Sequence, residues 1–324
     1  MKKGAIAVAG TVLVDKIYEI SAYPNAGELT KILNIQRSVG GCVPNVAIDL
    51  KRLSPDTEVL AVGRIGNDGE GKFVLDTLSR EGVSVENIVT GEGDGTGFTD
   101  VMSVVGGQRT FFTSSGANSV FGTADVDFSK LNVDVFHLGY FLLLDAVDGG
   151  EGIELLKRAS ERGIKTSIDL VSENSSRYAS VVSPVLPFTD NLIINETEAS
   201  GITGIEPSFE NLPTIAKKLM EMGVRERVII HTPKLGLCLD KNGITVLPSY
   251  ELPCGYIKGT TGAGDAFCAG ALIGILRDLS PVEILTVASG AAVASLGKAD
   301  ATSGVVTIGE IERITSTLSR KELS

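Results

Sequence analysis

Apolar residues occur along the chain in short continuous runs, and most runs are followed by a segment whose apolar residues recur every three or four positions. Short runs rich in Val, Ile and Leu are typical of strands buried on both faces, and the longer spacing is typical of amphipathic helices. The runs predict strands at 5–12, 59–65, 133–138, 166–170, 192–194 and 228–230. The spacing predicts helices at 41–53, 71–81, 150–162 and 211–222, and three more near 263–276, 281–296 and 308–320.

This alternation predicts an α/β fold, in which a central, mostly parallel sheet carries helices on both faces. The length of 324 residues is compatible with two domains or with one large unit and a small appendage. We interpret residues 1–324 as a single α/β domain. Ligands of such sheets bind at the carboxyl ends of the strands, so polar residues that follow strands are candidates for a site.

Two segments, 16–38 and 97–115, lack the helical spacing and alternate as extended chain does. Gly106-Gly107 separates two alternating runs in the second segment, which indicates a hairpin. Phe111 and Phe112 would expose apolar surface unless a substrate-covering closure or a second subunit buried them. Another hairpin is predicted at 236–247, with Asn242-Gly243 at its turn.

Composition adds mainly exclusions. The chain is 43% hydrophobic and 21% charged, as in ordinary globular proteins. A net charge of −11 argues against a nucleic-acid partner, which requires a basic surface. No apolar run approaches the ~18 residues that a membrane span needs. The N-terminal apolar run is interpreted as a buried first strand rather than a signal peptide, so we expect a cytoplasmic protein.

The cysteines, at positions 42, 238, 254 and 268, contain no Cys-x-x-Cys pair, and the chain has only two histidines, His137 and His231. This spacing argues against a zinc site. Cys42 and Cys268 are interpreted as buried free thiols that act as small apolar residues.

The chemistry concentrates in residues 259–267, Gly-Thr-Thr-Gly-Ala-Gly-Asp-Ala-Phe, at the start of a predicted helix. Glycines allow close backbone approach, and free amides in a first helical turn attract an anion. The amides of Gly262, Ala263 and Gly264 are therefore a candidate anion hole. Asp265 beside them is a candidate base, and phosphoryl transfer to an alcohol requires both parts. The alternative is a glycine-rich turn whose acidic residue only suits the helix dipole.

Three motifs together resemble the ribokinase-like (PfkB) carbohydrate kinase family. Residues 260–267 match its C-terminal signature, and 40–47, Gly-Gly-Cys-Val-Pro-Asn-Val-Ala, match its N-terminal Gly-Gly and Asn. Residues 195–198, Asn-Glu-Thr-Glu, resemble its Asn-x-x-Glu motif, and the three motifs span nearly the whole chain. The resemblance implies a ribokinase-like fold, ATP as phosphoryl donor with Mg²⁺, and a small β-sheet lid over the sugar, formed by 16–38 and 97–115.

The resemblance places sugar contacts at Asp15, Gly41 and Asn45. By itself Asp15 also fits a turn aspartate, whereas the amide of Asn45 can both donate to and accept from hydroxyls. Asn195 and Glu198 have the pattern of a helix-capping pair. The resemblance implies that they also organise Mg²⁺, with Glu198 acting through water, and the two roles are compatible.

The nucleotide side departs from the family pattern Thr-Leu-Gly-x-x-Gly, since residues 231–236 are His-Thr-Pro-Lys-Leu-Gly. Thr232, Gly236 and Thr261 are the candidate nucleotide contacts, and His231 could replace Thr232. A donor other than ATP stays open. Many members also carry Asp before the Thr-Thr-Gly-Ala-Gly-Asp run, where it helps to bind potassium. This chain has Gly259 there, so we expect little activation by a monovalent cation.

The resulting hypothesis is a kinase that phosphorylates a primary hydroxyl of a small sugar or polyol, with Arg109 and Tyr140 as further substrate contacts. Nucleosides and a sugar acid of the 2-keto-3-deoxygluconate type are alternative acceptors. A sugar phosphate could use Lys31, Arg37 and Arg109. A non-catalytic sugar sensor is the alternative of another class, although it would not need Asp265. A Rossmann dehydrogenase is disfavoured because Gly10 stands alone after the first strand. A homodimer through the lid is the one macromolecular assembly that we expect.

Overall fold

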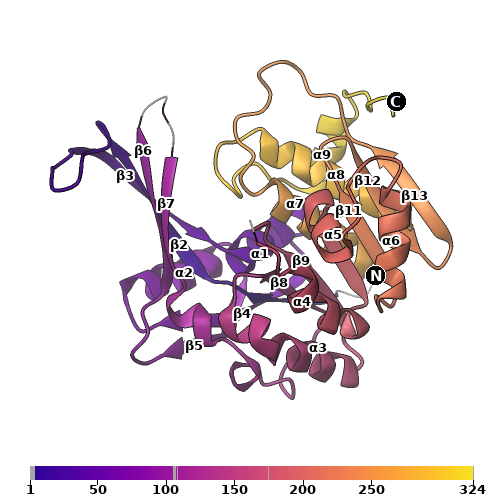
Figure 1. Cartoon of the computed structure of the whole chain (residues 1–324), viewed down its shortest axis with the longest axis horizontal. Helices are drawn as coiled ribbons and strands as arrows, with labels where there is room; N and C mark the ends of the chain where they lie inside the picture. Colours follow the sequence, from indigo (N-terminus) through magenta and orange to yellow (C-terminus); the bar gives the residue numbers. More distant parts are fainter. Residues whose placement is uncertain (1–3, 105–106, 108, 174, 324) are drawn as a thin grey trace.

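The computed structural model of the chain describes residues 4–104, 107, 109–173 and 175–323, which form a large and a small sheet (Figure 1). The large sheet has the strand order β13-β12-β11-β10-β9-β8-β1-β4-β5. In that order its strands are Gly243–Pro248, Leu235–Asp240, Arg227–His231, Asn191–Asn195, Lys165–Leu170, Val135–Phe141, Ala5–Gly10, Glu58–Gly66 and Ser84–Gly91. The strands from β11 to β5 are parallel, while β12 and β13 add an antiparallel hairpin at one edge.

The strands show why the apolar runs were informative. All six residues of β1 are buried, because helices cover both faces of the sheet. The six predicted parallel strands are confirmed, and the hairpin predicted at 236–247 is β12 and β13. Strand β8 continues to Phe141, beyond the predicted end at 138. Strand β5 was not predicted, because an edge strand of mixed polarity gives no continuous apolar signal.

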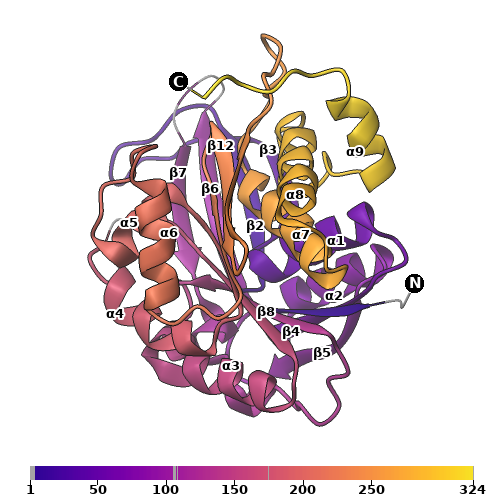
Figure 2. The same cartoon turned by 90° about the vertical axis from the view of Figure 1, so that its right-hand side faces the viewer.

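The helices divide between the two faces (Figure 2). Side chains of β1 show the division, since Ile6 and Val8 join one core cluster and Ala7 and Ala9 join the other. One face carries α1 (Cys42–Leu53), α2 (Gly69–Arg80), α7 (Ala263–Leu276), α8 (Pro281–Leu296) and α9 (Ile308–Thr315). The other carries α3 (Gly152–Glu161), α4 (Tyr178–Val182), α5 (Glu196–Thr203) and α6 (Leu212–Glu221). Short turns are η1 (Gly116–Val120), η2 (Thr123–Asp125), η3 (Val147–Glu151) and η4 (Ser183–Phe188).

Helix boundaries follow local capping. The predicted bounds 263–276 and 281–296 are confirmed by α7 and α8. Helix α2 begins two residues before the predicted start, because the Asp68 side chain accepts from the Gly71 amide and caps the helix. Helix α9 ends at Thr315, not at 320, and the chain beyond it forms a bridge between Tyr250 and Arg320.

The small sheet consists of β3 (Ile32–Gly40), β2 (Leu13–Ile20), β6 (Gly97–Val104) and β7 (Arg109–Ser114), in that order. The two segments predicted as extended therefore lie side by side, as Figure 1 also shows. The β6–β7 pairing confirms the hairpin, while Gly106 of its predicted turn lies outside the described residues. We call this sheet, β3-β2-β6-β7, the small sheet below.

The two faces of the small sheet differ in chemistry. Asp15 and Thr99 are register partners, so they share one face, and the neighbouring pair Lys16 and Asp100 lies on the other. On that second face Lys16 forms an ion pair of 3.0 Å with Glu70 of α2. The first face, which carries Asp15, is consequently the one turned away from α2.

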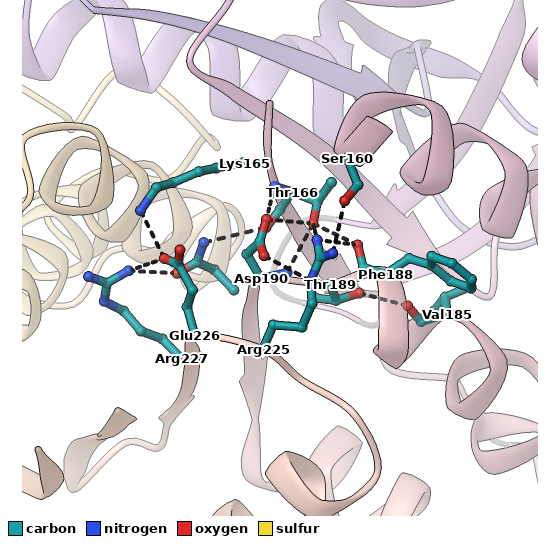
Figure 3. A network of polar contacts seen from close by, with 11 residues as sticks. Ser160, Lys165, Thr166, Val185, Phe188, Thr189, Asp190, Arg225, Glu226 and Arg227 are labelled. Atoms are coloured by element: carbon teal, nitrogen blue, oxygen red, sulfur yellow. Dashed lines mark hydrogen bonds and ion pairs between the residues drawn. The ribbon is translucent and has the colours of Figure 1, made fainter. Parts of the chain in front are cut away.

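A polar network joins the amino ends of β9, β10 and β11 (Figure 3). The Asp190 carboxylate accepts from the Thr166 amide at 2.8 Å and pairs with the Arg225 guanidinium at 2.9 Å. Lys165 and Glu226 form a further ion pair of 2.9 Å. Since ligands of parallel sheets bind at the carboxyl ends of the strands, we interpret this network as structural.

Candidate active site

Asp265 lies in the first turn of α7 and is only 5% exposed. Its carboxylate accepts from the Asn45 amide of α1 at 3.0 Å and from the Tyr140 hydroxyl of β8 at 3.0 and 3.1 Å. Burial and, to a smaller extent, the Asp169 carboxylate raise the pKa of Asp265 to about 7, although these two hydrogen bonds oppose the rise. A carboxylate with a pKa near neutrality is suited to act as a general base.

Tyr140 is held at both ends. Its hydroxyl donates to Asp265, and its backbone amide donates to Asp169 Oδ1 at 2.6 Å. Its φ of 59° lies in the left-handed region, which is strained for a tyrosine. Burial raises the pKa of the hydroxyl, so Tyr140 acts as a donor to the base. The sequence predicted Tyr140 as a substrate contact and not as a partner of Asp265.

The glycine pair before α1 allows the Asp15 side chain and the Thr11 backbone to approach closely. A Cβ on Gly40 would lie 2.4 Å from Asp15 Oδ2, and one on Gly41 would lie 2.6 Å from the Thr11 carbonyl oxygen. Gly41 also has a φ of 88°, so the fold alone requires glycine there. Burial raises the pKa of Asp15 to about 6, against a hydrogen bond with Thr99. The contacts thus run from Asp15, past the glycine pair, to Asn45 and the base.

The side chain of Asn45 has one polar atom that is free to bind a ligand. Its amide nitrogen donates to Asp265, whereas its Oδ1 is buried and has no hydrogen-bond partner among the described residues. A buried carbonyl oxygen without a partner is unfavourable, so this atom is suited to accept a hydroxyl of a bound ligand.

The start of α7 leaves space where an anion hole is expected. Gly262 has a φ of 79° and contacts the Ala301 backbone, so the turn itself requires glycine. A Cβ on Gly264, by contrast, would meet no atom within 4 Å among the described residues outside the neighbouring backbone of its own helix. The Ala263 amide is engaged by the Thr260 carbonyl at 3.3 Å, which leaves the neighbouring amides of the turn as the better donors. Thr261 is exposed beside them.

Two pockets meet at this turn. The larger, of about 480 Å³, has mostly apolar walls from Tyr250, Ile257, Phe267, Ala292, Val293 and Leu296. The smaller, of about 160 Å³, is lined by Asp265, Asp169 and Glu198. Gly264 lines both pockets, as do Asn195 and His231. A wider hollow of about 960 Å³ beside the C-terminal tail adjoins the apolar pocket but does not reach Asp265.

Asn195 and Glu198 form a capping box at the start of α5. Glu198 Oε2 accepts from the Asn195 amide at 3.0 Å, and Oε1 accepts from the Ser172 hydroxyl at 2.8 Å. Burial raises the pKa of Glu198 to about 7. The oxygen donors at this pocket fit Mg²⁺, which keeps most of its waters. Because both Glu198 oxygens already accept a hydrogen bond, a contact through water suits this carboxylate. Ser172 was not found from the sequence.

The nucleotide-side predictions fall in different places. Thr232 lines the apolar pocket, where its hydroxyl accepts from the Lys234 and Leu235 amides at 3.0 Å each. His231 lies on Phe267 with 4.7 Å between ring centroids, and burial lowers its pKa to about 4, so the ring is neutral. Gly236 is not among the lining residues, because it is buried in β12, where a Cβ would lie 2.9 Å from Leu285 of α8. Packing explains that glycine.

Arg109 is not brought to the other predicted residues. It pairs with Ser103 at the outer end of the small sheet, whereas Asp15 pairs with Thr99. Four residues of strand separate the two levels, a distance of about 13 Å. Arg109 does share the face of Asp15, so a movement of the sheet would have to bring it closer.

Comparison with known proteins agrees with the fold described above. The family model described as pfkB family carbohydrate kinase matches residues 6–308. The chain is 28% identical over 287 residues to a bifunctional ribokinase/ribose-5-phosphate isomerase A of Fructilactobacillus sanfranciscensis, covering 87% of this chain and 50% of that protein, so it spans half of that relative. It is 25% identical to a ribokinase of Haemophilus influenzae, over 93% of this chain and 95% of that protein. An Arabidopsis thaliana ribokinase structure, complexed with ribose and ATP, has a TM-score of 0.83 at 23% identity, covering 96% and 98%. No helix among the described residues is long and apolar enough to cross a membrane.

Proposed function

The chain belongs to the pfkB family of carbohydrate kinases, and from this premise we propose that it transfers the γ-phosphoryl group of ATP to a primary hydroxyl of a small uncharged sugar or polyol. As a carbohydrate kinase it is a phosphotransferase with an alcohol group as acceptor. The observation that carries the proposal is the meeting of two pockets at Gly264. A nucleotide in the apolar pocket would direct its phosphates over this open glycine toward Asp265.

In the proposed reaction Asp265 accepts the proton of the acceptor hydroxyl, and the hydroxyl oxygen attacks the γ-phosphorus in line while the bond to the β–γ bridging oxygen breaks and ADP leaves. Asn45 and Tyr140 hold the carboxylate in position through the hydrogen bonds described above. Amides of Gly262 and Gly264, at the positive end of α7, would stabilise charge on the transferred group. Mg²⁺ bound near Asn195 and Glu198 would neutralise phosphate charge.

The charges of the small sheet favour an acceptor without a phosphate group. Lys16 and Arg37 both pair with Glu70 of α2, at 3.0 and 3.2 Å. Arg37 also lies over the Phe73 ring, 3.9 Å from its centroid. Both cations therefore pair with Glu70 on the face opposite Asp15, where they do not serve an acceptor beside that residue.

We also propose that the small sheet acts as a lid and that its exposed apolar side chains are covered on assembly. Phe111 and Phe112 of the edge strand β7 are 63% and 57% exposed, and Ile35 of the other edge strand is 60% exposed. Exposed apolar edges of this kind support pairing with a second copy of the chain. Light scattering during size exclusion, on wild type and on Phe111→Ser, tests the dimer. A monomeric wild type would exclude it.

The function is tested by measuring ADP release with Mg²⁺ and ATP against free sugars, polyols, sugar acids, nucleosides and sugar phosphates. We expect turnover with an uncharged sugar or polyol, a phosphorylated product by mass spectrometry, and loss of activity when EDTA removes the cation. Thermal shifts with the same acceptors separate the alternatives. A sugar that raises the Tm without ADP release in any reaction would identify a sensor, and turnover restricted to sugar phosphates would refute the proposed acceptor class.

A further inference from the structure

Four buried side chains from four separate segments gather behind Asp265. Cys42 begins α1, His137 lies in β8, Asp169 ends β9, and Cys268 follows Asp265 by one turn of α7. His137 is completely buried, and Asp169 is 7% exposed. We call these four residues the Cys-His-Asp cluster. The proposed kinase reaction assigns no role to its two thiols or its imidazole.

Three members of the cluster, Cys42, His137 and Asp169, lie close enough together to ligate one cation, and Cys268 contacts His137 beside them. Cys42 Sγ, a His137 ring nitrogen and an Asp169 carboxylate oxygen all lie within 4.8 Å of one another. His137 Nε2 is 3.6 Å from Cys268 Sγ and 3.4 Å from Asp169 Oδ2. A tetrahedral zinc ion with bonds of about 2.0–2.3 Å separates its sulfur, nitrogen and oxygen ligands by roughly 3.3–3.8 Å, so the Cys42 and Cys268 sulfurs would move toward the ion on binding.

The remaining polar atoms of the cluster are already held by neighbours. His137 Nδ1 lies 3.2 Å from the Ser167 hydroxyl, and Asp169 Oδ1 accepts from the Tyr140 amide at 2.6 Å. This leaves Nε2 and Oδ2 directed at each other and at the sulfurs. Metal-binding histidines and carboxylates in proteins are commonly fixed by such second contacts. Gly139 leaves the space that Cys42 occupies, because a Cβ at this position would clash with Cys42 Sγ.

We propose that Cys42, His137, Asp169 and Cys268 bind a thiophilic divalent cation such as Zn²⁺. Two sulfurs, one imidazole nitrogen and one carboxylate oxygen match the ligands of zinc, whereas Mg²⁺ prefers an all-oxygen shell. The thiols release their protons to solvent on binding. Asp169 and Cys268 line the pocket of about 160 Å³, which gives the cation a route to the cluster. The bound ion would join α1, β8, β9 and α7 directly behind the proposed base.

The test is a titration of the metal-free full chain with Co²⁺, followed by visible and near-ultraviolet absorption. We expect one Co²⁺ per chain, with thiolate charge-transfer absorption and the intense visible bands of a tetrahedral site. Zn²⁺ should displace Co²⁺ stoichiometrically, and a large excess of Mg²⁺ should not. Cys42→Ala and Cys268→Ala should each lose the charge-transfer absorption or weaken binding by at least roughly tenfold. Cys254→Ala, which changes an exposed thiol elsewhere, is the matched control and should behave as wild type.

Two further measurements keep the test decisive. Melting curves of the metal-free variants show whether they are folded. Ser167→Ala, which keeps every ligand, should weaken Co²⁺ binding by about 10–100-fold through loss of the His137 contact. Absence of thiolate absorption in wild type would overturn the proposal, as would absorption that survives Cys42→Ala and disappears in Cys254→Ala. Because the readout is metal binding, this result stands apart from the outcome of the kinase assay.

Discussion

Replacing Asp265 by Asn tests the proposed base most directly, because the two side chains have the same shape and only the carboxylate can accept a proton. We expect turnover to fall by roughly 10²–10⁴-fold with little change in the KM of the acceptor. The pKa of about 7 adds a second signature. The ionised fraction of Asp265 rises from about one tenth at pH 6 to about nine tenths at pH 8, so wild-type kcat/KM, which reports the free enzyme, should rise nearly tenfold across that interval. The variant should lose this dependence.

The same substitution that lowers turnover should stabilise the fold relative to wild type as the pH rises, and the raised pKa of Asp265 explains this direction. Burial raises the pKa of Asp265 from its ordinary value of 3.8 to about 7, so the folded state binds the proton more tightly than the unfolded state. The stabilising effect of that proton is complete below about pH 4 and is lost as the pH rises through 7. The change corresponds to about 4 kcal/mol. The amide of Asp265→Asn does not ionise, so the free energy of unfolding of the variant relative to wild type should increase between pH 4 and pH 8.

Initial rates from pH 5.5 to 8.5 and urea unfolding at pH 5 and pH 8 measure both effects. Asp300→Asn is a suitable control, since it removes an exposed carboxylate in the loop that contacts Gly262. It should leave rate and stability profiles close to those of wild type. Near-wild-type turnover in Asp265→Asn would remove Asp265 from the mechanism. If the difference in unfolding free energy between variant and wild type is the same at pH 5 and pH 8, Asp265 is not a carboxyl with a raised pKa.

Three other changes test separate parts of the structure. Asp15→Ala should raise the KM for the acceptor roughly tenfold or more, because acceptor hydroxyls in a closed site would lose a hydrogen-bond partner. The KM for ATP should stay the same. An unchanged KM for the acceptor in initial-rate assays would show that the sugar binds elsewhere. Replacing potassium by tetramethylammonium at fixed ionic strength should change the rate little, since Gly259 supplies no carboxylate and its Cβ would lie 2.9 Å from the Ala299 carbonyl; a large, saturable potassium stimulation would contradict this. Asp190→Ala should lower the free energy of unfolding by about 2–4 kcal/mol, because it removes the carboxylate that holds Arg225 and the Thr166 amide. It should leave kcat unchanged. Urea unfolding and initial rates measure the two effects, and a matching loss of kcat would show that the network affects the active site.

The parts of the site that lie within one short segment could be predicted from the sequence. The turn that we propose as an anion hole and Asp265 follow one another on the chain, and the first turn of α7 places them together whatever the rest of the fold does. Asn195 and Glu198 form their capping box for the same reason. The apolar runs predicted the parallel strands because burial on both faces leaves a continuous hydrophobic pattern. Gly236 shows the limit of this reasoning, since its local motif suggested a nucleotide contact and the structure explains it by packing against α8.

Contacts between residues of distant segments could not be predicted from the sequence in this way. The sequence indicates where a strand lies but not which strand it joins or in which register, and these decide which side chains meet across the carboxyl edge of the sheet. Tyr140 reaches Asp265 across 125 residues because β8 extends beyond its predicted end. The absence of a Cys-x-x-Cys pair argued against a zinc site, yet the packing of α1 and α7 on one face of the sheet brings the thiols of Cys42 and Cys268 to His137 and Asp169. The sequence alone determined the chemistry of the single turn at α7, and the tertiary structure decided which groups surround it.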